Sequence, residues 1–388
     1  MASVDAVDLE RCRSESHVVN DLAATTDAIV RVNAHDRSRF QPYLISFDDS
    51  AINRAEFDLY PDVKALCLGD SRGFGRLRRL AKYVREENVQ LLHTYHGRSS
   101  FCARWVSRWL SVPNLFEDGG THFGYGVASR MLLMSNVVLC DRILCPSQTV
   151  WNSYGAMERL LADVGRVRII PYGISTEEIA SLRVDRVTEL ARYEVDPSCV
   201  VFVHTGRMVP IKDQEFLIRF YAFIARQYRG VHLLMVGDGP SRAKLERLVC
   251  EHGLRARVTF TGMLPRQGVY RLLKSSDVFI MTSRSEGLSV SLIEALACGL
   301  PAVLSDIPSF RETMKKDKGV VFIRRDAPIP EQAARVAREV VDAPTNRQRL
   351  GREALELTRS FYDGGRWMRD LEALYVDLIE EARERRRP

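Results

Sequence analysis

Short apolar runs alternate with amphipathic stretches along the chain. In the first half, runs of strand length occur at 42–47, 89–95, 112–117 and 142–147. In the second half, they occur at 199–206, 231–239, 257–262, 277–283 and 301–306. Stretches between these runs, such as 74–87 and 98–110, carry apolar residues at helical spacing. This alternation predicts parallel strands joined by helices, in sheets that are covered on both faces.

The alternation forms two blocks rather than one. A chain of 388 residues exceeds the usual size of a single core. The crossing between the blocks is expected within 166–179, where Pro171 and Gly173 interrupt the pattern. We therefore predict an α/β protein with two doubly wound, Rossmann-like domains.

Composition and charge exclude several classes of protein. Hydrophobic residues make up 46% and charged residues 27%, a globular rather than a disordered composition. A formal charge of +6 is too small to indicate a nucleic-acid partner. The first residues are acidic where a signal peptide is basic, and no apolar run is long enough to span a membrane. The eight cysteines have no metal-ligand spacing, which is typical of reduced thiols in a cytoplasmic protein.

The segments that follow the predicted strands of the second block are where ligand chemistry is expected. In open α/β sheets, ligands bind beyond the carboxyl ends of the strands, at the N-termini of the next helices. Arg207 and Lys212 beside such amides would form a site for a diphosphate. The candidate binding residues here are Gly206, Arg207, Lys212, Asp238, Gly239, Gly262, Met263, Glu286, Gly287, Leu288, Ser289 and Glu294.

Two carboxylates flank this anion site. Glu294 lies in an apolar helical stretch, where an unpaired carboxylate is costly, so we expect it to bind vicinal hydroxyls such as those of ribose. Glu286 precedes that helix and would face a sugar on the other side of the diphosphate. The glycines at 237–239 are not a dinucleotide fingerprint, because Arg242 occupies the position of the third glycine.

These motifs resemble those of the family-four glycosyltransferases, which have the GT-B architecture. The resemblance covers about 196–315 and rests on GRMVPIKD (206–213), LLMVGDGPSRAKLE (233–246), VTFTGMLP (258–265) and SSDVFIMTSRSEGLSVSLIEALACGLPAVLSD (275–306). It implies an acceptor-side domain over 1–172 and a nucleotide-sugar donor domain over 173–358. It further implies a C-terminal helix, within 359–388, that crosses back to the N-terminal domain.

The same resemblance implies an activity and residue roles. The protein would be a retaining glycosyltransferase that moves a sugar from a nucleotide-diphosphate sugar to a saccharide or lipid-linked acceptor, without a cofactor or a metal. Arg207 and Lys212 would neutralise the leaving diphosphate. Glu286 would contact the sugar and Glu294 the ribose. Gly262 and Met263 would lie near the base.

The N-terminal half resembles the family less closely. Members open with a strand and a glycine loop, but 11–32 lacks the glycines and reads as a helix capped by Ser14 or Ser16. Either the first strand is weak or missing, or Ser14, Glu15 and Ser16 replace the loop.

A second departure concerns histidines. Asp118 stands where the family often has a His that contacts the reacting sugar, and His122 follows four positions later. His122 is therefore a candidate catalytic residue, and the alternative is an ordinary loop histidine. His93 and His96 also end a predicted strand.

The helix predicted at 74–87 is basic and amphipathic. Phe74, Leu77, Ala81 and Val84 share one face among five cations. It could dock on an anionic membrane surface, which would place the protein on the inner face of the cell membrane, or it could be an ordinary packed helix. Trp105 and Trp109 fit either docking or core packing.

Three functions remain open on the sequence. A transferase in polysaccharide or glycolipid biosynthesis is favoured by the combination of two cations and two acids, Arg207, Lys212, Glu286 and Glu294. The missing glycine loop favours a non-catalytic relative that binds nucleotide sugar or acts as a scaffold. A nucleotide-sugar epimerase with the same architecture is the third.

Overall fold

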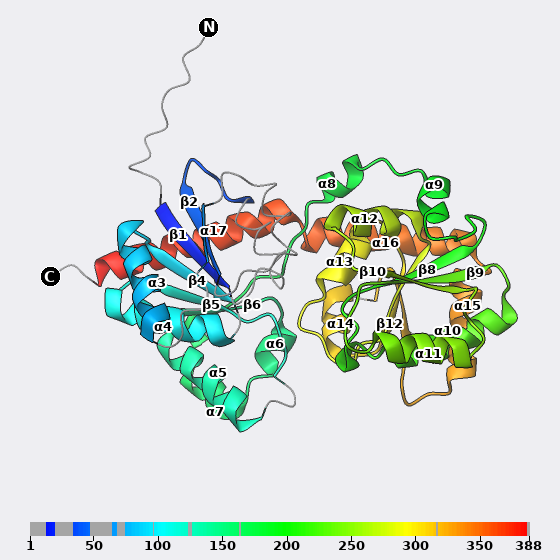
Figure 1. Cartoon of the computed structure of the whole chain (residues 1–388), viewed down its shortest axis with the longest axis horizontal. Coiled ribbons are helices and arrows are strands. Elements are labelled where there is room, and N and C mark those ends of the chain that lie inside the picture. Colours follow the sequence, from blue (N-terminus) through cyan, green and yellow to red (C-terminus); the bar gives the residue numbers. More distant parts are fainter. Residues whose placement is uncertain are drawn as a thin grey trace, which may run out of the picture. The chain divides into compact units, whose positions relative to one another are not determined.

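The chain divides into two compact units, each with one parallel sheet (Figure 1). The computed structural model describes residues 13–19, 34–46, 64–67, 74–95, 97–122, 126–162, 164–315 and 317–385. Unit 1 comprises residues 1–170 and 367–388, and unit 2 comprises residues 171–366. The chain thus leaves unit 1 two residues before the expected boundary at 172, and it returns at Trp367 rather than at 359.

Unit 1 is built on a seven-stranded sheet of order β3-β2-β1-β4-β5-β6-β7. Its strands are β1 (Arg13–Val19), β2 (Phe40–Ser46), β3 (Lys64–Cys67), β4 (Leu91–Tyr95), β5 (Asn114–Glu117), β6 (Arg142–Cys145) and β7 (Val167–Ile169). Its helices are α3 (Phe74–Glu86), α4 (Gly97–Leu110), α5 (Val127–Leu139), α6 (Gln148–Asn152), α7 (Ala156–Leu161) and most of α17 (Gly364–Glu384). All strand pairs are parallel, as the sequence predicted.

The first strand is present, which corrects the expectation of a weak or missing strand. β1 runs from Arg13 to Val19 and pairs with both β2 and β4, in the interior of the sheet. Ser14, Glu15 and Ser16 therefore belong to this strand and neither replace the glycine loop nor cap a helix. The segment 20–33, where that loop would follow, lies outside the described residues.

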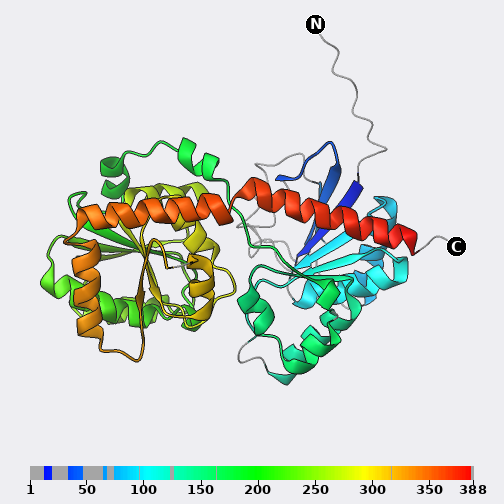
Figure 2. The ribbon, with the colours of Figure 1, turned by 180° about the vertical axis from the view of Figure 1, so that it is seen from behind.

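Helices cover both faces of this sheet. Leu92 of β4 packs with α3 and α4, in a core cluster that includes Leu80 and Val106. His93, the next residue, faces Tyr375 of α17 with a 2.6 Å hydrogen bond. Because successive side chains of a strand point to opposite faces, α17 lies on the face opposite α3 and α4 (Figure 2). The helix expected to cross back to the N-terminal domain is thereby confirmed.

Unit 2 is built on a six-stranded parallel sheet of order β10-β9-β8-β11-β12-β13. Its strands are β8 (Val200–Thr205), β9 (Val231–Val236), β10 (Val258–Gly262), β11 (Val278–Met281), β12 (Ala302–Ser305) and β13 (Val320–Ile323). Its helices are α8 (Thr176–Ser181), α9 (Arg186–Ala191), α10 (Gln214–Gln227), α11 (Arg242–Glu251), α12 (Arg266–Ser275), α13 (Val290–Ala297), α14 (Pro308–Met314), α15 (Ile329–Val340) and α16 (Pro344–Phe361). A 3₁₀ turn, η4 (Pro210–Lys212), precedes α10.

The central strands of unit 2 read as continuous apolar runs because both of their faces are covered. All four residues of β11 are buried, as are all six of β9. On one face, Leu217 of α10 and Val336 of α15 pack in the same core cluster as Ile280. None of the helices within the described residues is long and apolar enough to cross a membrane.

The two chain segments that connect the units meet inside unit 2. The amide of Ile174 donates to the carbonyl of Tyr362 at 3.0 Å, and the amide of Gly364 donates to the carbonyl of Ile174 at 3.0 Å. A Cβ on Gly173 would stand 2.5 Å from the carbonyl oxygen of Asp363, so only glycine permits this approach. Gly173 thus lets the outgoing segment pack directly against the returning one.

Candidate functional site

The sheet of unit 2 changes winding direction between β8 and β11. From β8 the chain proceeds outward to β9 and β10, and it then returns to β11 on the other side of β8. Such a reversal is the topological switch point of an open α/β sheet, and ligands of these sheets bind at the carboxyl ends of the strands there. The loop after β8 carries Lys212 and the loop after β11 carries Glu286.

Lys212 and Glu286 meet at this switch point. The Nζ of Lys212 donates to Oε1 of Glu286 at 2.7 Å. Both side chains are only partly exposed, at 19% for Lys212 and 11% for Glu286. The structure therefore brings together two predicted site residues that are 74 positions apart in the sequence.

Glycines let the loops after β8 and β9 lie against each other. Gly237 has φ +126°, and a Cβ there would stand 2.2 Å from the carbonyl oxygen of Gly206. Gly239 has φ +155°, and a Cβ there would stand 2.5 Å from the carbonyl oxygen of Met208. The predicted residues Gly206 and Gly239 thus shape the rim by close backbone approach rather than through a side chain.

Asp238 serves the local structure of the same rim. Its carboxylate accepts from the amide of Gly239 at 2.7 Å and from Arg242 at 2.9 Å. These two hydrogen bonds, the backbone one first, lower the pKa of Asp238. The carbonyl of Gly262 accepts from the amide of Gly237 at 2.9 Å, which ties β10 to the rim. Arg242, which replaces a third glycine, thus holds the turn.

The loop between β11 and α13 carries further predicted residues beside Glu286. Gly287, Leu288 and Ser289 are buried, and the Ser289 hydroxyl caps α13 by accepting from the amide of Leu292 at 3.3 Å. Glu294 lies in the second turn of α13. Burial, and then the charge of Glu294, raise the pKa of the Cys298 thiol to about 12. Glu294 is thus a half-buried carboxyl group inside a largely apolar helix.

Arg207 and Met263 reach outward from the rim. Arg207 is exposed, and its guanidinium makes no ion pair with any residue that the structure describes. Met263 is 65% exposed at the end of β10. Neither side chain is held in place by the fold, so both remain accessible to a ligand.

Asp213 is a structural anchor that the sequence analysis missed. It adopts φ +48° and caps α10, with its carboxylate accepting from the amide of Phe216. The same carboxylate accepts from Arg284 at 3.0 Å and from Arg325. Its position directly before a helical stretch was a sequence signal for a cap, but nothing in the sequence indicated Arg325, which lies 112 positions away.

His204 is a second missed residue, and it lies beneath Lys212. Its Nδ1 donates to the carbonyl of Ile280 at 3.0 Å, so its Nε2 is the acceptor that faces the Gln214 amide at 3.3 Å. Burial, offset in part by the bond to Ile280 and reinforced by the charge of Lys212, lowers the pKa of His204 to about 4. The imidazole is therefore neutral near pH 7.

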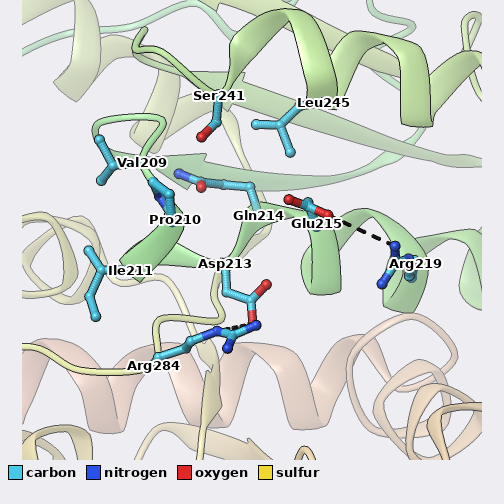
Figure 3. A pocket seen from close by; sticks show the side chains of 10 residues that line it. All are labelled: Val209, Pro210, Ile211, Asp213, Gln214, Glu215, Arg219, Ser241, Leu245 and Arg284. Carbon is cyan, nitrogen blue, oxygen red and sulfur yellow. Dashed lines mark hydrogen bonds and ion pairs between the residues drawn. The ribbon is translucent and has the colours of Figure 1, made fainter. Parts of the chain in front are cut away.

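A pocket of about 340 Å³ opens beside this rim (Figure 3). It is lined by Val209, Pro210, Ile211, Asp213, Gln214, Glu215, Arg219, Ser241, Leu245 and Arg284. The Asp213 and Arg284 pair forms one wall, and Glu215 faces Arg219 at 3.9 Å on another. None of the predicted donor residues lines this pocket. It therefore lies on the outer side of the loop that carries Lys212.

In unit 1, His122 is held in a buried cluster. Its Nε2 donates to Oδ2 of Asp118 at 2.7 Å, and its backbone amide donates to the Ser153 hydroxyl at 3.0 Å. The Tyr154 hydroxyl donates to the same oxygen of Asp118. Burial, and then the Asp118 charge, raise the pKa of Tyr154. The residue expected to replace the family's histidine is thus bonded to the aspartate that stands in its place.

His93 also lies in a buried polar cluster. Its Nε2 stands 3.1 Å from Oε2 of Glu117, and its ring stacks on Tyr95 with centroids 4.4 Å apart. Its bond to Tyr375 makes it a contact for α17. His96 lies outside the described residues.

Two Rossmann-like units, with a topological switch point between β8 and β11 in unit 2, match the GT-B architecture, which confirms the predicted fold class. Residues 189–357 match the family model of the glycosyl transferases of group 1. The matched part of the chain contains the motifs found in the sequence.

The chain is similar to known proteins both in sequence and in structure. The phosphatidylinositol N-acetylglucosaminyltransferase GPI3 subunit of Saccharomyces cerevisiae is 23% identical over 60% of the chain and 52% of its own length. The alpha-D-kanosaminyltransferase of Streptomyces kanamyceticus is 29% identical over 73% of the chain and 76% of its own length. The structure of Anabaena HepE in complex with UDP and glucose superposes with a TM-score of 0.81 at 14% identity, covering 94% of this chain and all of that one. The chain spans about half the length of the yeast relative.

Proposed function

We propose that the protein is a retaining glycosyltransferase that moves a sugar from a nucleotide-diphosphate sugar to a saccharide or lipid-linked acceptor. The observation that carries the proposal is the pairing of Lys212 with Glu286 at the switch point of unit 2. Ligands of such sheets bind at this point. An ammonium and a carboxylate in contact there offer one group for a phosphate oxygen and one for sugar hydroxyls.

Each predicted residue has a role in this proposal. The sugar's bond to the diphosphate oxygen breaks, the acceptor oxygen bonds to the same carbon, and the acceptor's proton passes to the leaving diphosphate. Lys212 stabilises the charge that develops on the leaving group, and exposed Arg207 closes on it. Glu286 accepts from the sugar hydroxyls and Glu294 from the ribose. Gly262 and Met263 border the base, and the amides of Gly287, Leu288 and Ser289 face the phosphates.

The names of similar proteins support the donor and acceptor classes. The HepE structure contains UDP and glucose, and the yeast relative is named for N-acetylglucosaminyl transfer to phosphatidylinositol. We extend the proposal to polysaccharide or glycolipid biosynthesis in the cytoplasm, at the inner face of the cell membrane. The basic helix α3 would contribute to that location, because Arg78, Arg79, Lys82 and Arg85 are exposed on it.

The experiment that tests the proposal separates binding from transfer. The purified chain is titrated with nucleoside diphosphates while its thermal unfolding is followed. A bound nucleotide should raise the midpoint by an amount that grows with the logarithm of its concentration divided by its Kd. The stabilising nucleotide is then supplied as its sugar conjugates, with lipid and saccharide acceptors, and release of free nucleoside diphosphate is measured. Binding without transfer to any acceptor would favour the non-catalytic relative. Absence of nucleotide binding would contradict the donor site itself.

A further inference from the structure

The exposed large apolar side chains of the described residues are concentrated on one part of unit 1. Of the fifteen such side chains, ten lie on the four helices α3, α4, α5 and α7. They are Phe74, Phe101, Trp105, Trp109, Val127, Met131, Val138, Met157, Leu160 and Leu161. A soluble domain scatters such side chains singly, so this concentration requires an explanation.

The four helices form a continuous surface. α3 packs against α4, α4 against α5, and α5 against α7. Their inner sides are already used in the fold, because Leu80, Ala103 and Val137 lie in the cores beneath them. Figure 1 shows the four helices together on one side of the unit 1 sheet. We call their outer surface the docking face.

α4 supplies the aromatic part of the docking face. Phe101, Trp105 and Trp109 recur at every fourth position, which places them in one stripe along the helix. They are 43%, 51% and 56% exposed, so core packing does not account for the two tryptophans. The guanidinium of Arg85, on α3, lies over the ring of Trp109 at 5.0 Å. Arginine and tryptophan in contact at a surface suit the headgroup level of a bilayer.

The charge of the docking face has one sign. The exposed cations on the four helices are Arg78, Arg79, Lys82, Arg85, Arg108, Arg130 and Arg159. Among the described side chains of these helices, only one acid is exposed. It is Glu86, which pairs with Lys82 at 3.6 Å. Glu158 is buried and pairs with Arg130 at 3.2 Å. The surface therefore combines apolar side chains with excess positive charge.

α3 does not account for membrane docking alone. Its apolar side, with Leu80, Ala81 and Val84, packs into the core beneath it, while Phe74 is 69% exposed rather than part of that side. An amphipathic helix that has buried its apolar side has little left to insert into lipid. The aromatic stripe of α4 and the apolar residues of α5 and α7 supply that missing part.

We infer that the docking face binds the surface of an anionic lipid bilayer, with α4 at its centre. The exposed cations match anionic headgroups, and the tryptophans and leucines match the boundary between headgroups and acyl chains. A second copy of the chain is a poor occupant, because two such faces would bring like charges together. The inference deepens the proposed function by placing the transferase at a lipid-linked acceptor, but its test needs no nucleotide and no transfer.

The experiment measures binding of the full chain to vesicles by co-flotation and by tryptophan fluorescence. Vesicles of equimolar phosphatidylglycerol and phosphatidylcholine should bind the protein, and vesicles of phosphatidylcholine alone should bind it far more weakly. Rising salt should release the protein, because the screening length falls from about 10 Å at 0.1 M to about 3 Å at 1 M. Anionic vesicles should shift the emission to shorter wavelength. Replacing Trp105 and Trp109 by Ser should abolish most of that shift, because the other two tryptophans lie outside the docking face: Trp151 is half-buried on α6 and Trp367 is buried.

Matched variants separate the docking face from general surface effects. Arg85→Gln with Arg108→Gln should weaken binding to anionic vesicles by roughly thirtyfold, from a loss of about fivefold for each cation. Arg352→Gln with Arg359→Gln removes the same charge from exposed positions of α16 and should leave binding unchanged. Phe361→Ser is the control for an exposed aromatic side chain outside the face.

Specific results would overturn the inference. Equal binding to neutral and anionic vesicles would contradict it, as would equal effects of the two arginine pairs. A dimer that shields Trp105 and Trp109 from an aqueous quencher, in a protein that ignores vesicles, would assign the face to a second copy. Vesicle binding with no nucleotide binding would leave the docking face intact while refuting the transferase, so the two failures are distinguishable.

Discussion

Lys212 and Glu286 form an ion pair of 2.7 Å across the point where the unit 2 sheet changes winding direction. Each lies in the loop that leaves one of the two strands at that point, β8 and β11. The partly buried pair presents a cation and an anion that need little reorganisation when a charged ligand arrives. The pair therefore links the leaving-group end of the proposed donor site to its sugar end.

Replacing Lys212 by Ala should weaken both nucleoside diphosphate binding and turnover. The ammonium is proposed to stabilise charge that grows on the leaving diphosphate, and removal of one such donor costs about 2.7–4 kcal/mol of barrier. Calorimetry and steady-state kinetics measure the two effects. Lys244→Ala is the matched control, because Lys244 is 61% exposed and pairs with Glu215 at 2.6 Å. Equal losses in the two variants would refute a specific role for Lys212.

Replacing Glu286 and replacing Glu294 should have different effects. Glu294→Ala should weaken binding of the free nucleoside diphosphate, because its proposed partner is the ribose. Glu286→Ala should spare that binding or strengthen it, since the Lys212 ammonium loses its neutralising partner, but it should impair the intact nucleotide sugar and the rate. Calorimetry with the free nucleoside diphosphate decides between them. If both variants bind it like the parent, or both lose it equally, the division of labour is wrong.

The His122 and Asp118 pair predicts a defect in turnover without a defect in nucleotide binding. His122→Ala removes a donor from a buried carboxylate, which should cost about 1–3 kcal/mol of stability and lower kcat. His122→Gln retains a side-chain donor and should recover part of both. Wild-type kcat in a destabilised His122→Ala protein would assign the residue to the fold alone. His93→Gln then becomes the next variant to measure.

Close backbone approach at the rim predicts an intolerant glycine. Gly239→Ala would place a Cβ 2.5 Å from the carbonyl oxygen of Met208, at φ +155°. Overpacking of this kind costs about 1–3 kcal/mol, and denaturant unfolding should show it. Gly230→Ala meets no heavy atom within 4 Å and should change stability by less than about 0.5 kcal/mol. Equal stabilities of the two variants would show that the loop relaxes around the added methyl group.

The alternation of apolar runs predicted most strands of the two sheets, because buried parallel strands are continuously apolar. The runs at 231–239 and 277–283 became β9 and β11. β1 was missed because Arg13–Ser16 are polar or charged, and its pairing with β2 and β4 is a tertiary choice that local propensity does not encode. β7 has three residues, too few for a pattern to be recognised.

The candidate site was predictable where it depended on position after a strand. Lys212 and Glu286 could be placed at the rim because parallel strands bring their carboxyl ends together. Their direct contact required the strand order, which the sequence did not reveal. The bond of Arg325 to Asp213 had no local signal at all. The sequence thus indicated which loops form the site. Which charged side chains pair with each other could be seen only in the tertiary structure.

The stability of unit 2 should fall as the pH falls from about 6.5 towards 4. His204 is fully buried, and its folded-state pKa of about 4 lies below the ordinary value of 6.5. His232 behaves likewise, because burial lowers its pKa to about 4. Between pH 6.5 and 4, these two histidines bind protons in the unfolded chain but not in the folded one. The free energy of unfolding therefore decreases on acidification through this range. Above pH 6.5 it does not depend on these two groups. Each unit of difference between the folded and unfolded pKa corresponds to about 1.36 kcal/mol per group. The free energy of unfolding should therefore fall by a few kcal/mol.

Urea unfolding of the full chain across that pH range measures the slope. His204→Leu should lower stability near pH 7, because it removes the donor to the Ile280 carbonyl and the acceptor for Gln214. It should also make the pH dependence shallower, since one titrating group is gone. His232→Gln should also reduce the slope of stability against pH. Unlike His204→Leu, it leaves the environment of Lys212 unchanged. A slope that neither variant reduces would mean that the two imidazoles can accept protons without unfolding.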